Sequence, residues 1–360
     1  MKSINNKIVI ATGGTGGHIF PAVGLKENLE QKGFLVSLTT DSRGLKFLSK
    51  FDYLKLKVIK SVPFNTNIFI SLLKNILAIA NSLTFLLKKK PKFVFGMGGY
   101  ASFSVCCAAI ILRIPVVIYE NNLHIGKSNR YLLPFAKKLF LAYSETEGIK
   151  LNYKNKVFTV GNILRKEILD FSKNKTINNN EKLNILILGG SQAAKIFAEK
   201  LPEIFVKCKN IGLNFKIFQQ CLPYQNQSLE NFYKKNQIEY ELFNFSFNML
   251  KFYKLTNLVI SRAGSSALSE SLNCSIPIIS VPLKTAADNH QFKNAKYFEK
   301  KGFGIILKEE NIDDELFQLL HSMHKDKSIL NNMIQKHQTH NDKFVFKKLN
   351  KEIEKLFYEN

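Results

Sequence analysis

The chain has few of the residues from which disulfide frameworks and metal sites are built. Its 360 residues include five cysteines, an odd number, and no Cys-x-x-Cys pair. The first residues run directly into an apolar strand, without the apolar region of a signal peptide. These absences indicate a protein of the reducing cytosol that uses no metal, and we expect no other cofactor.

Acidic residues and arginines are also scarce. The chain has 28 Asp and Glu against 52 Lys and Arg, which gives a formal net charge of +24. Such a charge favours an anionic partner, but Lys, Asn, Ile and Phe are abundant throughout, which is typical of biased coding, and we expect no nucleic-acid partner. Guanidinium groups suit planar recognition of phosphate or carboxylate, so the arginines are the informative cations. They are Arg43, Arg113, Arg130, Arg165 and Arg262, of which Arg165 and Arg262 lie in motif-like segments.

No uninterrupted apolar run is long enough to cross a membrane. Residues 68–87 have the length, but a lysine and two asparagines interrupt them, so we expect a helix that does not span a bilayer. Part of its apolar face is expected to pack on the sheet. Leu73, Ile76 and Ile79, which have lysines nearby, are predicted to dip into anionic lipid.

Two common nucleotide-binding fingerprints are absent from the glycine-rich segment at residues 8–21, Ile-Val-Ile-Ala-Thr-Gly-Gly-Thr-Gly-Gly-His-Ile-Phe-Pro. The third glycine of a dinucleotide site would fall on Ile19, and no Walker A ending follows. The segment predicts a strand, a glycine turn and a helix, whose amide groups can bind an anion. A tight turn without a ligand is the alternative, but Thr15 and His18 favour a site.

The apolar pattern predicts two α/β domains. Apolar runs alternate with helical stretches, which is typical of a parallel sheet covered by helices. We expect strands at 7–11, 34–39, 92–95, 116–119 and 139–142, and then at 183–188, 215–218, 257–261, 276–281 and 304–307. The second set again opens with a strand, two glycines and a hydroxyl residue. Two facing Rossmann-like domains would bring both glycine loops to one cleft.

Each half has a second polar cluster after a strand. Residues 95–102 are glycine-rich, and the segment 119–122 ends in two amides that could hold sugar hydroxyls. Residues 259–270 predict a strand, a glycine turn and a hydroxyl-rich helix start suited to a diphosphate, with Glu270 placed to accept hydrogen bonds from a ribose diol. Plain helix capping by two serines is the alternative. Residues 282–291 add amide and imidazole groups after the next strand.

Seven segments, in order and spacing, resemble the MurG family of UDP-N-acetylglucosamine:lipid I N-acetylglucosaminyltransferases. They are residues 13–21, 96–100, 120–122, 160–165, 189–192, 261–270 and 288–291, and the resemblance extends from about Lys7 to the final helix. It implies the GT-B fold and an inverting transfer of GlcNAc from UDP-GlcNAc to the C4 hydroxyl of MurNAc in lipid I. The product would be lipid II of peptidoglycan synthesis, and no metal would be required.

The resemblance also implies roles for individual residues. His18 would be the catalytic base, with a purely structural role as the alternative. The donor-sugar and acceptor contacts would be Thr15, Gly16, Gly17, Asn122, His290 and Gln291. The uridine and diphosphate contacts would be Arg165, Ser191, Ser265, Ser266, Ala267, Leu268, Ser269 and Glu270, with the backbone of Phe245 and Ser246 at the uracil. Ala193 and Asn121 depart from the family pattern, which usually has Gly and Gln there.

The resemblance and the sequence pattern together suggest three parts. Residues 1–162 would form the acceptor-binding, membrane-facing domain, residues 163–340 the UDP-GlcNAc domain, and residues 341–360 a helix that packs back on the first domain. The protein is expected as a peripheral protein on the cytoplasmic face of the bacterial inner membrane, with an anionic membrane surface, and cell-wall and division proteins, as candidate partners.

Three alternatives stay open. One is another GT-B enzyme that uses UDP-GlcNAc, either a 2-epimerase or a transferase with a soluble acceptor. The second is a dinucleotide-dependent oxidoreductase, against which the missing third glycine argues. The third is a non-catalytic interaction protein, against which the intact glycine loops, His18 and Glu270 argue.

Overall fold

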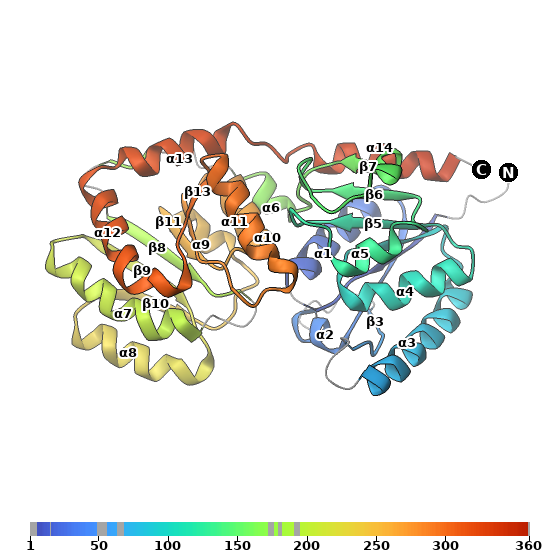
Figure 1. The fold of residues 1–360 in the computed structure, drawn as a ribbon, viewed down its shortest axis with the longest axis horizontal. Coiled ribbons are helices and arrows are strands. Elements are labelled where there is room, and N and C mark those ends of the chain that lie inside the picture. Colours follow the sequence, from blue (N-terminus) through green and yellow to red (C-terminus); the bar gives the residue numbers. More distant parts are fainter. Residues whose placement is uncertain are drawn as a thin grey trace. The chain divides into compact units, whose positions relative to one another are not determined.

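The computed structural model describes residues 6–14, 16–48, 56–62, 68–171, 176–178, 182–190 and 195–358. The chain divides into two compact units (Figure 1): unit 1 comprises residues 1–165 and 342–360, and unit 2 comprises residues 166–341. Each described unit is built on one fully parallel sheet with helices packed against it.

Unit 1 contains a seven-stranded sheet in the order β3-β2-β1-β4-β5-β6-β7. Its strands are β1 (Lys7–Ala11), β2 (Leu35–Thr40), β3 (Leu56–Val58), β4 (Phe93–Gly96), β5 (Val116–Glu120), β6 (Lys138–Leu141) and β7 (Val157–Thr159). Its helices are α1 (Gly16–Gln31), α2 (Ser42–Leu48), α3 (Ile68–Lys89), α4 (Gly99–Ile111), α5 (Lys127–Leu132), η1 (Leu151–Lys156) and α14 (Val345–Tyr358). Strand order reverses between β1 and β4, and in sheets of this kind ligands usually bind at such a reversal, outside the carboxyl ends of the strands.

Unit 2 repeats the pattern with a six-stranded sheet in the order β10-β9-β8-β11-β12-β13. Its strands are β8 (Leu183–Leu188), β9 (Phe215–Gln220), β10 (Glu239–Phe243), β11 (Leu258–Ser261), β12 (Ile278–Ser280) and β13 (Gly304–Ile306). Its helices are α6 (Lys166–Leu169), α7 (Lys195–Asn210), η2 (Pro223–Gln225), α8 (Asn226–Lys235), α9 (Leu250–Leu255), α10 (Ser265–Asn273), η3 (Ala287–Asn289), α11 (His290–Lys300), η4 (Glu309–Asn311), α12 (Ile312–Lys325) and α13 (Ser328–Gln338). Here the order reverses between β8 and β11.

Every strand expected from the sequence forms, with ends within two residues of the predicted ones. The sequence did not predict β3, β7 and β10. All three are edge strands of their sheets, and most of their residues are only partly buried. An edge strand needs no continuous apolar run, which is the signal that revealed the central strands.

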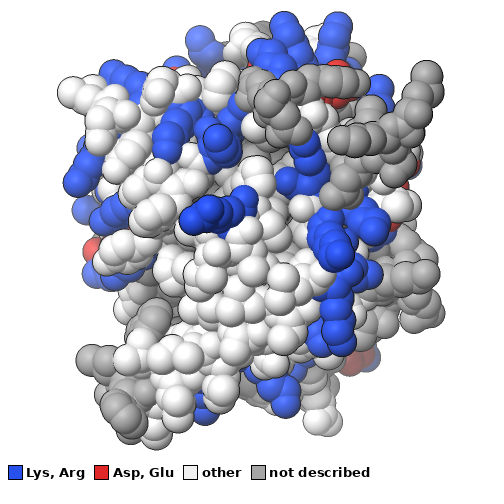
Figure 2. All heavy atoms as spheres, turned by 90° about the vertical axis from the view of Figure 1, so that its right-hand side faces the viewer, with Lys and Arg blue, Asp and Glu red and all other residues white. Residues whose placement is uncertain are grey.

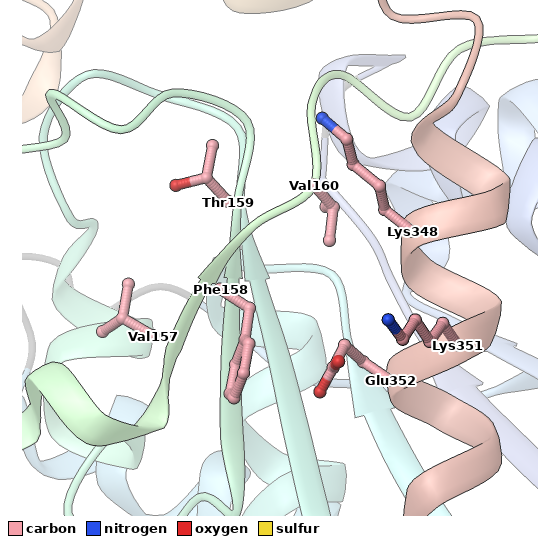
Figure 3. A pocket seen from close by; sticks show the side chains of 7 residues that line it. All are labelled: Val157, Phe158, Thr159, Val160, Lys348, Lys351 and Glu352. Atoms are coloured by element: carbon pink, nitrogen blue, oxygen red, sulfur yellow. The ribbon is translucent and has the colours of Figure 1, made fainter.

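The C-terminal helix α14 belongs to unit 1 although the whole of unit 2 precedes it in sequence. In Figure 1 this red helix lies beside the green strands β6 and β7. The Phe357 ring lies 4.9 Å from that of Phe34 and 5.6 Å from that of Phe93, and Lys138 Nζ is 2.7 Å from Glu352 Oε2. A cavity of about 350 Å³ between β7 and α14, shown in Figure 3, contains none of the site residues expected from the sequence; it is lined by Val157, Phe158, Thr159, Val160, Lys348, Lys351 and Glu352.

The first crossing between the units lies at residue 165, three residues later than expected. Residues 161–163 are held to unit 1 by hydrogen bonds. The Asp342 carboxylate accepts from Asn162 N at 3.0 Å and from Asn162 Nδ2 at 2.9 Å. Ile163 N donates to the Tyr119 hydroxyl at 3.0 Å. Arg165 therefore belongs to unit 1 rather than to the second domain.

Candidate functional site

A buried carboxylate holds the first glycine loop, which connects β1 to α1. Asp41 follows β2, the strand next to β1, and only 1% of it is exposed. Its Oδ1 accepts hydrogen bonds from Gly14 N at 3.0 Å and from Gly44 N at 2.8 Å. Gly14 has a φ of +83°, a conformation that glycine adopts without strain. Asp41 is not among the site residues expected from the sequence; its signal there is an acid directly after a strand.

His18 lies in the first turn of α1 against the second glycine turn, between β4 and α4. A side chain at Gly98 would place its Cβ 3.0 Å from His18 Cε1, and Gly98 has a φ of +90°. Only glycine lets the imidazole lie this close to the turn. The sequence predicted the two glycine segments separately, and the neighbouring positions of β1 and β4 bring them together.

The Glu120-Asn122 segment after β5 forms a closed hydrogen-bond network. Glu120 Oε1 accepts from Asn122 N at 3.0 Å and Asn122 Nδ2 at 2.9 Å, and Oε2 accepts from Gly126 N at 2.8 Å. Asn121 Nδ2 donates to Gly17 O at 2.9 Å, and Asn121 Oδ1 accepts a second bond from Asn122 Nδ2. Both amide hydrogens of Asn122 are thus used within the loop, and Asn121 ties it to α1.

In unit 2, Glu270 is nearly buried in α10, and its Oε2 accepts a hydrogen bond from Tyr253 Oη at 2.9 Å. The N-cap position of this helix is Gly264, so neither of the two serines weighed as caps occupies it. The helix begins at Ser265 after Gly264, no side chain caps it, and Ser269 Oγ donates to Ser266 O instead. The positive end of the helix dipole lies at this first turn, where an anion can bind.

Arg262, which the sequence analysis singled out, has structural partners. Its guanidinium forms an ion pair with Glu309 and donates to Val281 O at 3.2 Å. It also lies 5.3 Å from the centroid of the Phe197 ring. These contacts join the ends of β11 and β12 to α7. Arg262 therefore stabilises the position of the glycine turn between β11 and α10.

The remaining residues of the predicted donor site follow the carboxyl ends of β10 and β12. His290 opens α11 after Asp288 and Asn289, whose φ angles are +51° and +54°. Gln291 Oε1 accepts from the backbone N–H of Leu283 at 3.0 Å. Ser246 lies in the loop between β10 and α9. The described donor-site residues of unit 2, in β10–α9, α10 and α11, thus share one edge of its sheet.

Two predicted site residues, Thr15 and Ser191, lie outside the described residues, as does Ala193. Arg165 is buried and its guanidinium carbon lies 5.2 Å from the centroid of the Phe20 ring, within unit 1. His18, Gly16, Gly17 and Asn122 gather at the carboxyl edge of the unit 1 sheet.

Comparisons with known proteins agree across both units. Residues 8–141 match the glycosyltransferase family 28 N-terminal domain, and residues 184–352 match the family 28 C-terminal domain. The UDP-N-acetylglucosamine–N-acetylmuramyl-(pentapeptide) pyrophosphoryl-undecaprenol N-acetylglucosamine transferase of Rickettsia bellii is 40% identical over 86% of this chain and 88% of its own. The protein of the same name from Pelagibacter ubique is 36% identical over 87% of each chain. The crystal structure of Acinetobacter baumannii MurG matches with a TM-score of 0.75 at 26% identity, over 97% of this chain and 99% of that chain. The chain belongs to the MurG family.

As a MurG family member, the chain is a glycosyltransferase with the GT-B fold.

Unit 1 also has a helix with an exposed apolar face. Helix α3 is long and apolar enough over Ile70–Lys89 to cross a membrane, and 28% of that segment is buried. Its buried residues, which include Ser71, Asn75, Ala78 and Ser82, recur every three to four positions and form one face.

The other face of α3 exposes large apolar side chains. Six of them are about half exposed: Ile70, Leu72, Leu73, Ile76, Leu77 and Leu87. Of the three residues predicted to enter lipid, Leu73 and Ile76 are exposed, whereas Ile79 packs partly buried against the core of unit 1. Figure 2 views the side of the molecule on which α3 lies and shows a broad uncharged area bordered by Lys and Arg, with few acidic side chains.

Proposed function

We propose that this MurG family enzyme transfers GlcNAc from UDP-GlcNAc to the C4 hydroxyl of MurNAc in lipid I and so forms lipid II for peptidoglycan synthesis. One observation carries the proposal: identities of 36% and 40%, over nearly the whole chain, to transferases whose names specify this donor and acceptor. The two sets of polar loops support it, since a transfer between two substrates needs two binding surfaces.

The chemistry requires a base and a stabilised leaving group. We assign the base to His18, which would accept the proton of the acceptor hydroxyl as its oxygen bonds to C1 of GlcNAc. The bond from C1 to the diphosphate breaks in the same step, and UDP leaves. The N-terminus of α10, which begins at Ser265, would stabilise through its dipole the charge that develops on the diphosphate.

The ligand contacts follow the division into units. We assign the acceptor to unit 1, with Gly16, Gly17 and Asn122 lining its site together with Thr15. We assign UDP-GlcNAc to unit 2, where Glu270 would hold the ribose. The other donor contacts would be Ser191, Ser246, Ser265, Ser266, Ala267, Leu268, Ser269, His290 and Gln291. The resemblance also assigns Arg165 to the donor.

A product assay separates this function from its alternatives. Radiolabelled UDP-GlcNAc and a lipid I analogue should give a GlcNAc-MurNAc product and UDP. A 2-epimerase would instead convert UDP-GlcNAc to UDP-ManNAc without any acceptor. Transfer only to soluble sugars, or no transfer to the lipid I analogue, would contradict the proposal.

The donor assignment predicts a specific defect for Glu270→Ala. Losing a charged hydrogen-bond partner of the ribose should raise the KM for UDP-GlcNAc about 10- to 150-fold, the equivalent of about 1.5–3 kcal/mol. Tyr253→Phe, which removes the hydroxyl at 2.9 Å from Glu270, should raise it less because only the orientation of the carboxylate is loosened. An unchanged donor KM in a folded Glu270→Ala protein would refute the ribose role.

We further propose that the enzyme binds the cytoplasmic face of the inner membrane through the exposed face of α3. Its half-exposed Leu73 and Ile76 can insert among acyl chains, while Lys88 and Lys89 at the end of the helix meet anionic headgroups. This arrangement brings unit 1 to the surface in which the lipid-linked acceptor is anchored. Cell-wall and division proteins remain candidate partners there.

A further inference from the structure

Arg43 is a fixed, half-exposed cation beside the first glycine loop. Arg43 lies in α2, two residues after Asp41, and 49% of its side chain is exposed. Its Nε and Nη2 lie 3.2 Å and 3.1 Å from Asp41 Oδ2, and its guanidinium carbon lies 4.4 Å from the centroid of the Tyr100 ring. The carboxylate and the ring hold the guanidinium plane from two sides.

The position of Arg43 ties it to the loops of the site. A Cβ added at Gly14 would lie 2.9 Å from Arg43 Nη2, so the guanidinium lies directly against the glycine loop. Tyr100 lies in the first turn of α4, directly after the second glycine turn, whose Gly98 lies close to His18. Arg43 thus borders both loops that surround His18, and its fixed orientation lowers the entropy lost when it binds a ligand.

Asp41 reduces the number of backbone N–H groups that the first glycine loop can donate to a ligand. Gly14 N already donates to Asp41 Oδ1, so this amide is used within the protein. Asp41 uses its other oxygen to orient Arg43. The half-exposed guanidinium keeps further N–H groups for a ligand, and its planar fork suits phosphate or carboxylate better than an ammonium does. Only five of the 52 basic residues are arginines.

Building on the proposed function, we propose that Arg43 binds an anionic group of the acceptor, with Asp41 as its positioning residue. The acceptor carries two kinds of anion, the diphosphate and the carboxylates of its peptide, and a guanidinium can bind either. The donor is assigned to unit 2, whereas Arg43 and its partners all lie in unit 1. A substitution of Arg43 should therefore lower the affinity for the acceptor and leave the affinity for UDP-GlcNAc unchanged.

The test compares Arg43→Ala and Arg43→Lys with Lys46→Ala, which removes an exposed cation from the same helix. Arg43→Ala should raise the KM for a lipid I analogue tenfold or more, keep the KM for UDP-GlcNAc within twofold, and keep the melting temperature. Arg43→Lys should restore part of the affinity, and Lys46→Ala should behave like the wild type. Calorimetric titration of the acceptor analogue without donor should show the same order of Kd values.

Two acceptor analogues identify the anion. If an analogue without the peptide shows the full Arg43→Ala defect, the diphosphate is the ligand; if the defect disappears, the ligand is a peptide carboxylate. An unchanged acceptor KM and Kd in folded Arg43→Ala would overturn the inference, as would equal increases in both KM values. A wild-type enzyme that transfers nothing to the analogue would refute the proposed function, and calorimetry would still decide the role of Arg43.

Discussion

Three buried carboxylates each hold the backbone of a loop in unit 1. Asp41, Glu120 and Asp342 are each almost fully buried, and each accepts at least one backbone N–H from a nearby loop. Hydrogen bonds that involve a carboxylate are among the stronger ones in proteins, so a single acidic side chain can fix the backbone of a loop. These acids keep the loops ordered before any substrate arrives.

His18 provides the first prediction at this scale. If it is the base, His18→Ala should lower kcat by about 10²–10⁴ and change the KM for UDP-GlcNAc little, because the loss is confined to the proton transfer. Steady-state kinetics with the lipid I analogue measure both values, and thermal unfolding serves as the control. A loss of activity that follows a lower melting temperature would instead support a structural role against the Gly98 turn.

Helix α3 shows how one element serves two environments. Its small and polar side chains Ser71, Asn75 and Ser82 face the interior, and Asn75 Nδ2 donates to Ser71 O at 2.9 Å. Six large apolar side chains face outward although Phe85 and Leu86 are buried, whereas an ordinary surface helix exposes mainly polar side chains. A soluble environment alone does not account for this pattern.

The exposed face of α3 predicts membrane binding. Leu73→Gln combined with Ile76→Gln should release the enzyme from anionic liposomes in a flotation assay, while turnover of a soluble acceptor analogue is kept. High salt should weaken wild-type binding without abolishing it, since apolar insertion is not screened. Leu255→Gln, at an exposed leucine of unit 2, is the matched control. Undiminished liposome binding by the double variant would place the docking surface elsewhere.

Helix α13 contains a buried histidine that should make the free energy of unfolding depend on pH. His337 is almost fully buried, which lowers its pKa to about 4 despite the contact of its Nε2 with Phe303 O at 2.6 Å. In the unfolded chain its pKa is about 6.5, so the unfolded state binds more protons between these values. The free energy of unfolding should therefore fall as the pH drops from about 6.5 to about 4, by up to about 3 kcal/mol.

Urea unfolding at several pH values tests this prediction. His337→Gln removes the titrating group and retains a hydrogen-bond donor, so the variant should lose less stability than the wild type between pH 7 and pH 5. If both proteins lose the same amount, other groups are responsible for the acid sensitivity.

For the whole molecule, the two units have separate cores and the last helix returns to the first. Leu349 and Ile353 of α14 are buried in unit 1, whereas Met323 of α12 is buried in the core of unit 2. A chain built in this way need not unfold in a single transition.

Hydrogen exchange tests the independence of the units. Leu349→Ala should destabilise unit 1 by about 2–5 kcal/mol and speed exchange in β1, β4 and β6, with β8 and β11 unaffected. Met323→Ala should give the opposite pattern. Equal loss of protection in both sheets would mean that the units unfold as one.

Local sequence patterns specify the alternation of strands and helices, the two repeated halves and the glycine turns, because these depend on residues close together in the chain. It also identified the family motifs around His18 and Glu270. The tertiary structure decided the partners of these motifs: Asp41 at Gly14, Asn121 at Gly17 across 104 residues, and Tyr253 at Glu270. Such contacts depend on which strands become neighbours in the sheet. That order is fixed by the packing of the whole unit, which no local pattern encodes.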